Sequence, residues 1–377
     1  MIYFDHNSTT KLAPEVLAKM VEAYGMPLNS SSVHQLGQRA NGLVEGARQE
    51  VKKFLNAENY EIIFTSNATE ATNNVIFGAE VEKIFFSKIE HNSVYNCRPN
   101  GKRIVEINAT KDGLVNISDL KTKIEEVAEG DPTLNFLTSA MLAQNETGAI
   151  QPISEITKLV HRKGGLIHCD IVQAAGKIEV DLENLNVDFA SISAHKINGP
   201  QGIGALLIRK GLDIKPLIYG SGQEKSKRGG TLNVAGIVGF GEACKLAKSS
   251  LAKYQKISEL RDFLEKEVKE IGGENVKIFS QNIERLPNTS YIATKKFATK
   301  NFDSQTQLIN FDLNGICVSA GAACSSGTLR ESRVLKAMLV DPAFSNSAIR
   351  VSLGAQNTQD EVEKFIKIWK EFYKKNT

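Results

Sequence analysis

The sequence contains little cysteine, little proline and no long hydrophobic run. Its 377 residues include nine prolines and five cysteines, which are Cys97, Cys169, Cys244, Cys317 and Cys324. The cysteines are widely spaced and form no C-x-x-C pair, so neither a disulfide framework nor a zinc ribbon is predicted. No stretch reaches the roughly 20 apolar residues of a membrane span. The first residues show no basic and apolar leader pattern, and we expect a reduced, cytoplasmic protein.

Charge of one sign is also scarce. Lysine and arginine number 46 and aspartate and glutamate 43, which gives a formal net charge of +3. This balance excludes a strong electrostatic attraction to nucleic acid or to an anionic membrane, and we expect no direct contact with either. Hydrophobic residues make up 41% of the chain, enough for a packed core, and the length suits about two domains.

Short apolar runs alternate with amphipathic runs in the first part of the chain. Hydrophobic residues spaced by three and four predict a helix over residues 35–56. Further helices are predicted near 118–128 and 153–163. The predicted strands are residues 61–66, 83–88, 103–108, 134–142, 165–170, 188–194 and 204–210. This alternation predicts an α/β fold with a mostly parallel sheet that is covered on both faces.

The pattern changes after a long helical region, predicted at about 233–272. The elements predicted beyond it are strands at 276–280, 289–295, 315–321 and 348–354 and helices near 304–312, 331–339 and 358–374. Such a mixture is typical of a smaller α+β domain.

The strongest local signal for chemistry is a lysine at the end of an apolar strand. Lys196 ends the run SAHK, directly before the glycine-rich stretch at 198–204. Burial lowers the pKa of a lysine and makes its amine nucleophilic, as a Schiff-base lysine requires. A surface lysine at a strand end is the alternative, and this feature alone leaves both open.

Asp170 ends the apolar run at 165–170, and we expect it at the carboxyl edge of the sheet, where ligands bind in open α/β folds. A carboxylate there keeps a pyridine nitrogen protonated, so that the ring accepts electrons. A helix N-cap is the alternative. The neighbouring His168 and Cys169 lack a second pair of ligands, so we predict no metal site.

Weaker signals follow other predicted strands. The run TSNATE (65–70) joins a strand to a helix, and the free N–H groups of a helix start, together with the Thr69 hydroxyl, form a phosphate cradle. Asn145 follows the strand at 134–142, in a place suited to binding a polar group of a substrate or cofactor. His91 begins another strand-to-helix junction. A helix cap, a turn and a structural histidine explain these features as well in isolation.

Two residues stand out towards the C-terminus. Cys324 lies in the run VSAGAACSSG (318–327), whose small side chains cannot pack around a thiol, so we expect an accessible, reactive cysteine. An incidental free thiol is the alternative. The other cysteines lie in or beside apolar runs and are predicted to be core residues. Arg350 is a cation in an apolar strand, where it needs a carboxylate partner from the protein or from a substrate.

In this order the motifs resemble those of the NifS/IscS-type cysteine desulfurases, which are class V aminotransferases among the fold-type-I pyridoxal-phosphate enzymes. The resemblance runs from YFDHNSTT (3–10) to the last helix, and SAHKINGPQGIGAL and SAGAACSSGTL carry it most specifically. It implies a large cofactor-binding domain with a mostly parallel seven-stranded sheet, residues 16–255. A small α+β domain, residues 256–377, would carry the catalytic cysteine loop, and the N-terminal segment 1–15 would join it.

The resemblance also implies a role for each motif. Lys196 would hold pyridoxal 5′-phosphate covalently, Asp170 would pair with its pyridinium nitrogen and Gln173 with its phenolic oxygen. His91 would stack on the ring and move protons. The remaining cofactor-binding residues would be Ala68, Thr69, Ser193, His195 and Thr231, the last reaching the phosphate of the other subunit of a homodimer. The substrate carboxylate would be bound by Asn145 and Arg350, with Asn29 nearby.

These roles imply that the protein removes sulfur from L-cysteine, giving L-alanine and a persulfide on Cys324. An acceptor protein of iron–sulfur cluster assembly or tRNA thiolation would then take the sulfur. The alternatives are another class V activity, such as an aminotransferase or a selenocysteine lyase, and a non-catalytic scaffold homologue.

The chain departs from the usual pattern of the family at several positions. Ser8 stands where alanine is common in D-x-x-A-T-T, and Ser30 stands where proline is usual in Gly-Asn-Pro. Asn67 replaces the glycine before Ala-Thr-Glu, and Gly229 replaces a serine. Asparagine tolerates a positive φ, so we expect the phosphate cradle to survive at Asn67.

Overall fold

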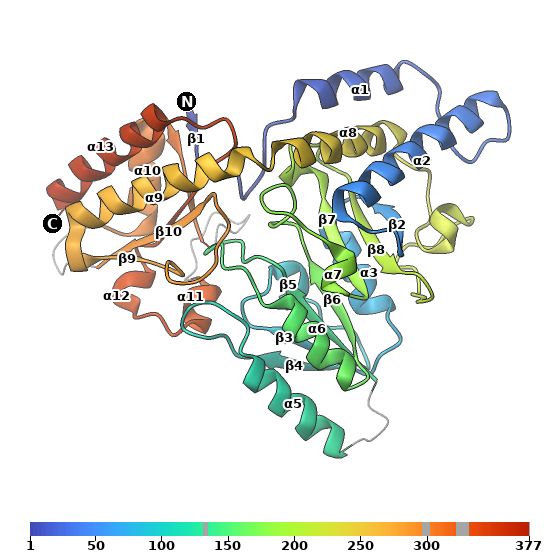
Figure 1. Cartoon of the computed structure of the whole chain (residues 1–377), viewed down its shortest axis with the longest axis horizontal. Coiled ribbons are helices and arrows are strands. Elements are labelled where there is room, and N and C mark those ends of the chain that lie inside the picture. The colour runs from blue at the N-terminus through green and yellow to red at the C-terminus, as the bar shows by residue number, and fades with distance from the viewer. Residues whose placement is uncertain (131–134, 296–301, 322–331, 377) are drawn as a thin grey trace.

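The computed structural model describes residues 1–130, 135–295, 302–321 and 332–376. Its elements form two groups, one from the first two thirds of the chain and one mainly from the last third (Figure 1). In the ranges described, none of the helices combines the length and the apolar character that a membrane crossing needs.

A seven-stranded sheet lies at the centre of the larger group. Its strands, in spatial order, are β2 (Tyr60–Thr65), β8 (Gly204–Arg209), β7 (Phe189–Ser193), β6 (Leu166–Asp170), β5 (Phe136–Met141), β3 (Lys83–Ser87) and β4 (Arg103–Ile107). Strand β8 pairs antiparallel with both β2 and β7, and the other pairs are parallel, so β8 runs opposite to the other six strands. The predicted mostly parallel sheet is confirmed, and each strand lies within two residues of its predicted bounds.

Helices cover both faces of this sheet. Alternate side chains of a strand point to opposite faces. Accordingly, Ile62 and Phe64 of β2 pack into one hydrophobic core with α2, α6 and α8, whereas Ile63 packs into another with α3. The helices of this group are α1 (Pro14–Tyr24), α2 (Gln35–Leu55), α3 (Ala68–Gly78), α4 (Asn92–Tyr95), α5 (Ile117–Gly130), α6 (Ile153–Arg162), α7 (Leu182–Leu185) and α8 (Val234–Ser250).

A four-stranded antiparallel sheet lies at the centre of the smaller group. Its strands, in spatial order, are β12 (Ser319–Ala320), β13 (Ile349–Ser352), β10 (Thr289–Thr294) and β9 (Val276–Ile278). The helices around it are α9 (Lys253–Gly272), α10 (Ser304–Leu313), α11 (Arg333–Ala337), α12 (Pro342–Ser345) and α13 (Gln359–Asn376). A separate parallel pair, β1 (Ile2–Tyr3) with β11 (Ile316–Cys317), attaches the N-terminus to this group.

The helical region predicted over 233–272 is confirmed and consists of two helices, α8 and α9, separated by a turn at residues 251–252. One other prediction is wrong in detail. The strand predicted over 315–321 is two short strands in different sheets, because β11 pairs with β1 while β12 pairs with β13.

The parallel strands bring several predicted site residues to one edge of the large sheet. Asp170 is the last residue of β6, and Lys196 lies in a short 3-10 helix (Ala194–Lys196) directly after β7. His91 and Asn145 follow β3 and β5, and α3 begins at Ala68 after β2. The carboxyl ends of parallel strands meet at the same edge, which explains this gathering.

Candidate functional site

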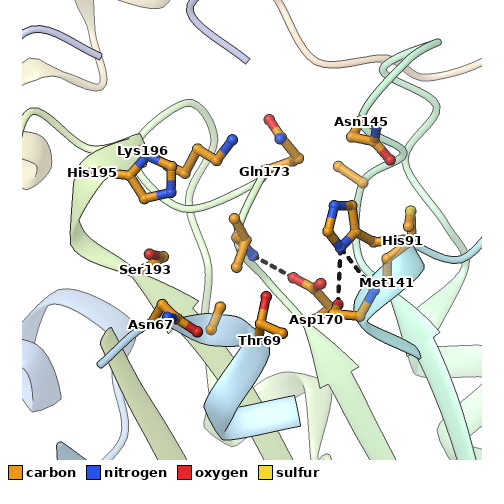
Figure 2. A pocket seen from close by; sticks show the side chains of 14 residues that line it. Asn67, Thr69, His91, Met141, Asn145, Asp170, Gln173, Ser193, His195 and Lys196 are labelled. Atoms are coloured by element: carbon orange, nitrogen blue, oxygen red, sulfur yellow. Dashed lines mark hydrogen bonds between the residues drawn. The ribbon is translucent and has the colours of Figure 1, made fainter. Parts of the chain in front are cut away.

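A pocket of about 250 Å³ lies at this edge of the large sheet (Figure 2). The predicted site residues that line it are Ala68, Thr69, His91, Asn145, Asp170, Gln173, Ser193, His195 and Lys196. Figure 2 shows Lys196, Gln173 and Asn145 along the upper side of the view and Asn67, Thr69 and Ser193 along the lower side. The pocket therefore joins side chains from strands that are distant in the sequence.

The Lys196 amine donates hydrogen bonds to two backbone carbonyls of the N-terminal segment. Its Nζ donates to the carbonyl oxygens of Asn7, at 2.5 Å, and Ser8, at 2.6 Å. Burial, followed by the charge of Arg350, lowers the pKa of Lys196 to about 8. At pH 7.4 roughly a fifth of this amine is therefore neutral and nucleophilic, far more than for an ordinary lysine.

The Asp170 carboxyl lies at the bottom of the same pocket. It is 7% exposed, and its Oδ1 accepts a hydrogen bond from the Val172 N–H at 2.9 Å. Burial raises the pKa of Asp170 to about 6, although the Val172 N–H and the Lys196 charge act against it. A carboxyl with this pKa is ready to pair with a protonated ring nitrogen, whose charge would favour the ionised form.

Two histidines border the pocket, and both are neutral at pH 7. His91 caps the start of α4, and its Nδ1 lies 2.9 Å from Ser93 Oγ. His195 Nδ1 lies 3.1 Å from Thr9 Oγ1. Burial lowers the pKa of each imidazole to about 4. A neutral imidazole can accept a proton or lie against an aromatic ring without placing a charge in the pocket.

The start of α3 offers the features of an anion site. Ala68 and Thr69 form its first turn and line the pocket. Ser193 Oγ, on the same side of the pocket as this turn, is buried and has no hydrogen-bond partner among the described residues. Asn67 does not use the positive φ that asparagine tolerates, because its backbone is extended with φ −174°. Asn67 instead caps the helix, and its side chain accepts from the Glu70 N–H at 2.8 Å.

A second pocket of about 510 Å³ opens beside the first and shares His91, Asn145, Gln173 and Lys196 with it. Arg350 lines this pocket, and its side chain is 5% exposed. The carboxylate partner that the sequence requires is Asp5, whose Oδ1 lies 2.7 Å from Arg350 Nη2.

Sequence reasoning missed several polar groups of the site. The carbonyls of Asn7 and Ser8 and the Ser8 hydroxyl come from the N-terminal segment, which was expected to join the small domain but not to contact Lys196 or Arg350. Lys177, 3% exposed, donates to both the carbonyl and the Oε1 of Gln173, at 2.9 and 3.1 Å. A lysine inside the buried stretch after β6 was a signal that could have been noticed.

Some predicted residues lie elsewhere. Asn29 and Thr231 are exposed and line neither pocket. Cys324 lies outside the described residues, between Gly321 and Ser332. Of the four cysteines predicted to be core residues, Cys97, Cys169 and Cys244 are buried, whereas Cys317 is half-buried.

Comparisons with known proteins place this geometry in context. The family model described as Aminotransferase class-V matches residues 2–365. "Cysteine desulfurase IscS" of Clostridium botulinum is 36% identical over 97% of this chain and 93% of its own length. The same-named protein of Dictyoglomus turgidum is 37% identical over 96% and 91%. The crystal structure of a NifS-like protein from Rickettsia africae has a TM-score of 0.90 and 38% identity, and the match covers 99% of both chains.

Proposed function

The chain belongs to the class V aminotransferase family, and from this membership we propose that it is a pyridoxal-phosphate-dependent cysteine desulfurase. The observation that carries the proposal is that the Lys196 amine and the Asp170 carboxyl face one pocket at the carboxyl edge of the sheet. L-Cysteine is the proposed substrate, and L-alanine and a persulfide on Cys324 are the proposed products.

The residues of the pocket fit this cofactor. A phosphate needs several hydrogen-bond donors, and the first turn of α3 together with the unpartnered Ser193 hydroxyl provides them. A pyridine nitrogen needs a carboxylate, which Asp170 provides, and an aldehyde needs an amine, which Lys196 provides. When bound, the cofactor supplies an electron sink for the pair left at the substrate α-carbon.

Each residue then has a defined task. Arg350 and Asn145 bind the substrate carboxylate in the second pocket, which holds the α-carbon near Lys196. Lys196 Nζ takes the α-proton, since its lowered pKa leaves it partly neutral. With the cofactor bound, Asp170 would hold the proton on the ring nitrogen, Gln173 would donate to the phenolic oxygen, and His91 would stack on the ring.

Cys324 completes the reaction as the sulfur acceptor. Its thiolate attacks the substrate sulfur, so that an S–S bond forms while the bond between the substrate β-carbon and sulfur breaks. The β-carbon keeps the electron pair of the broken bond and takes up a proton, so it becomes the methyl group of L-alanine. Cys324 keeps the persulfide. The oxidation of sulfur is thus balanced by the reduction of this carbon, and no external oxidant is needed. A sulfur-acceptor protein then takes the terminal sulfur. We propose iron–sulfur cluster assembly or tRNA thiolation as its pathway, and a cytoplasmic setting that keeps the thiol reduced.

We also propose the domain division 1–15, 16–255 and 256–377. One hydrophobic core combines Phe4 with residues from 257 onwards, including Trp369. A separate core lies around α2, α6 and α8. This separation supports two domains, with the N-terminal segment packed on the smaller one.

Replacing Cys324 tests the proposed function. In Cys324→Ser the lysine-bound cofactor should keep its visible absorbance, because Lys196 and Asp170 are untouched, while formation of L-alanine and sulfide from L-cysteine should fall to background. Cys317→Ser is a matched control, because that half-buried cysteine has no role in the proposal. Undiminished turnover in Cys324→Ser would contradict the assignment of the sulfur acceptor.

A further inference from the structure

Arg350 is held by groups of the N-terminal segment and of the turn after β5. Its Nη2 lies 2.7 Å from Asp5 Oδ1 and 2.8 Å from Ser8 Oγ, and its Nη1 donates to the Asn145 carbonyl at 2.9 Å. Ser8 Oγ in turn donates to Asp5 Oδ1 at 2.8 Å. Arg350 Nε is buried and has no partner among the described residues.

The geometry of a guanidinium limits what a carboxylate can bind. Arginine has five N–H donors in one plane, and a carboxylate binds bidentately only through two donors on one edge. The side edge uses Nε with Nη2, and the end edge uses Nη1 with Nη2. Both edges therefore need a hydrogen of Nη2, and Asp5 and Ser8 accept from this nitrogen.

We propose that Ser8 is a positioning residue that weakens binding of the substrate carboxylate by occupying one Nη2 hydrogen of Arg350. Without the hydroxyl this hydrogen is free, and together with Nε or Nη1 it completes a bidentate edge. Ser8 is exposed at the second pocket, so its side chain can change without disturbing a core. The inference rests on the proposed function, in which Arg350 binds the carboxylate of L-cysteine.

The same contact affects the product. L-Alanine carries the same carboxylate and amine as L-cysteine. Weaker binding of the carboxylate by Arg350 therefore also speeds dissociation of the product. Ser8 thus sets the balance between substrate capture and product release at Arg350.

Kinetics of the holoenzyme test the inference. In Ser8→Ala we expect KM for L-cysteine to fall roughly threefold, since a hydrogen bond to a charged group is worth at least this much in partly exposed sites, while kcat stays within about twofold. The dissociation constant of L-alanine, measured from the absorbance change of the bound cofactor, should fall in parallel. Ser8→Thr keeps the hydroxyl and should retain the wild-type values. An unchanged or raised KM in Ser8→Ala overturns the inference.

A ligand without a carboxylate distinguishes an effect on the contact between Arg350 and the carboxylate from a general effect of Ser8→Ala on the pocket. Cysteamine has the amine and thiol of L-cysteine but nothing for Arg350 to bind, so its dissociation constant should be the same in the wild type and in Ser8→Ala. A fall as large as that for L-alanine would overturn the inference. If the wild type does not turn over L-cysteine, the proposed function fails, and the L-alanine measurement still decides the role of Ser8.

Discussion

At the scale of single residues, the Asp170 carboxyl is proposed to pair with the ring nitrogen of the cofactor, and its burial destabilises the folded protein when it is ionised. It is buried, and among the residues described no cation lies within 4.0 Å of it. Burial raises its pKa from 3.8 to about 6. In the unfolded chain this carboxyl ionises near its ordinary value, so between pH 4 and 6 the folded state binds more protons, and stability falls as pH rises through this window.

Asp170→Asn should therefore stabilise the cofactor-free protein while abolishing its activity. The asparagine is neutral at every pH, so at pH 8 the gain should reach up to about 3 kcal/mol, because each pKa unit corresponds to about 1.4 kcal/mol. The gain should be about half as large at pH 5. Urea unfolding of the two apoproteins at both values measures it. The holoenzyme should lose activity, because asparagine cannot hold the ring proton.

The control is Asp112→Asn, which changes an exposed carboxylate. It removes one negative charge from the surface and should leave the free energy of unfolding within about 0.5 kcal/mol of the wild type. Equal stability of Asp170→Asn and the wild type at pH 8 would show that burial of this carboxylate is compensated in the folded protein.

Residues at strand ends could be predicted from the sequence, and residues contributed by distant loops could not. Lys196 and Asp170 each end an apolar run, so the rule that parallel strands share a carboxyl edge was enough to place them together. The carbonyls of Asn7 and Ser8 reach Lys196 across 189 and 188 residues of sequence. No local pattern encodes such a contact, because it depends on how the two sheets dock.

At the scale of elements, β12 ends where the segment that carries Cys324 begins. Gly321 follows β12 and packs against Tyr291 of β10 and the Glu146 carboxyl so closely that an added Cβ would overlap both. Ser332, which follows the segment, donates to Glu146 Oε2 at 2.5 Å. Both ends of residues 322–331 are therefore tied to one buried carboxyl, next to Asn145.

Gly321→Ala should displace this junction. We expect a loss of about 1–3 kcal/mol in the free energy of unfolding, as for other overpacked sites, and a roughly tenfold lower kcat, because misplacement of a reacting group is costly. Denaturant unfolding and steady-state kinetics measure the two effects.

Gly42→Ala is the matched control. Gly42 lies inside α2, and an added Cβ there meets nothing within 4 Å. The change should raise stability by about 0.5–1 kcal/mol and leave kcat unchanged. If Gly321→Ala instead kept the stability and kcat of the wild type, Tyr291 and Glu146 would have to yield to the added methyl group without consequence.

Secondary structure could be predicted from the sequence wherever the whole of a predicted segment belongs to, or packs on, a single sheet. The helix over 35–56 and the strands of the large sheet have clear hydrophobic patterns, and they appear close to their expected bounds. The run at 315–321 has an equally good strand pattern, but its two halves pair with β1 and β13 in separate sheets. The alternation of hydrophobic residues indicates that a segment is extended, but it does not indicate with which strand the segment pairs.

At the scale of the whole molecule, an exposed apolar segment lies beside Thr231. Leu217, Ile218 and Tyr219 are 40%, 39% and 78% exposed. The Gly229 N–H donates to the Ile218 carbonyl at 2.8 Å, which holds this segment next to the turn that leads to Thr231. A surface of this kind fits the expectation from the family resemblance that Thr231 reaches the cofactor site of a second copy, and we propose such a homodimer.

We predict that the protein sediments as a dimer at micromolar concentration and that Tyr219→Glu shifts it towards the monomer. The monomer should also bind less cofactor, because each site then lacks the Thr231 of the other subunit. Leu313→Glu, at an 82% exposed position on α10, should leave both properties unchanged. A wild-type monomer that is fully loaded with cofactor would refute the shared site.

The contact between Asp5 and Arg350 sets an order for biosynthesis. The two residues are 345 positions apart, and at 5–20 residues per second the ribosome needs on the order of 20–70 s to pass from one to the other. During this time the large sheet and the pocket around Lys196 can form, but the arginine site is incomplete. Binding of the substrate carboxylate must therefore wait until Arg350 has been synthesised and has paired with Asp5.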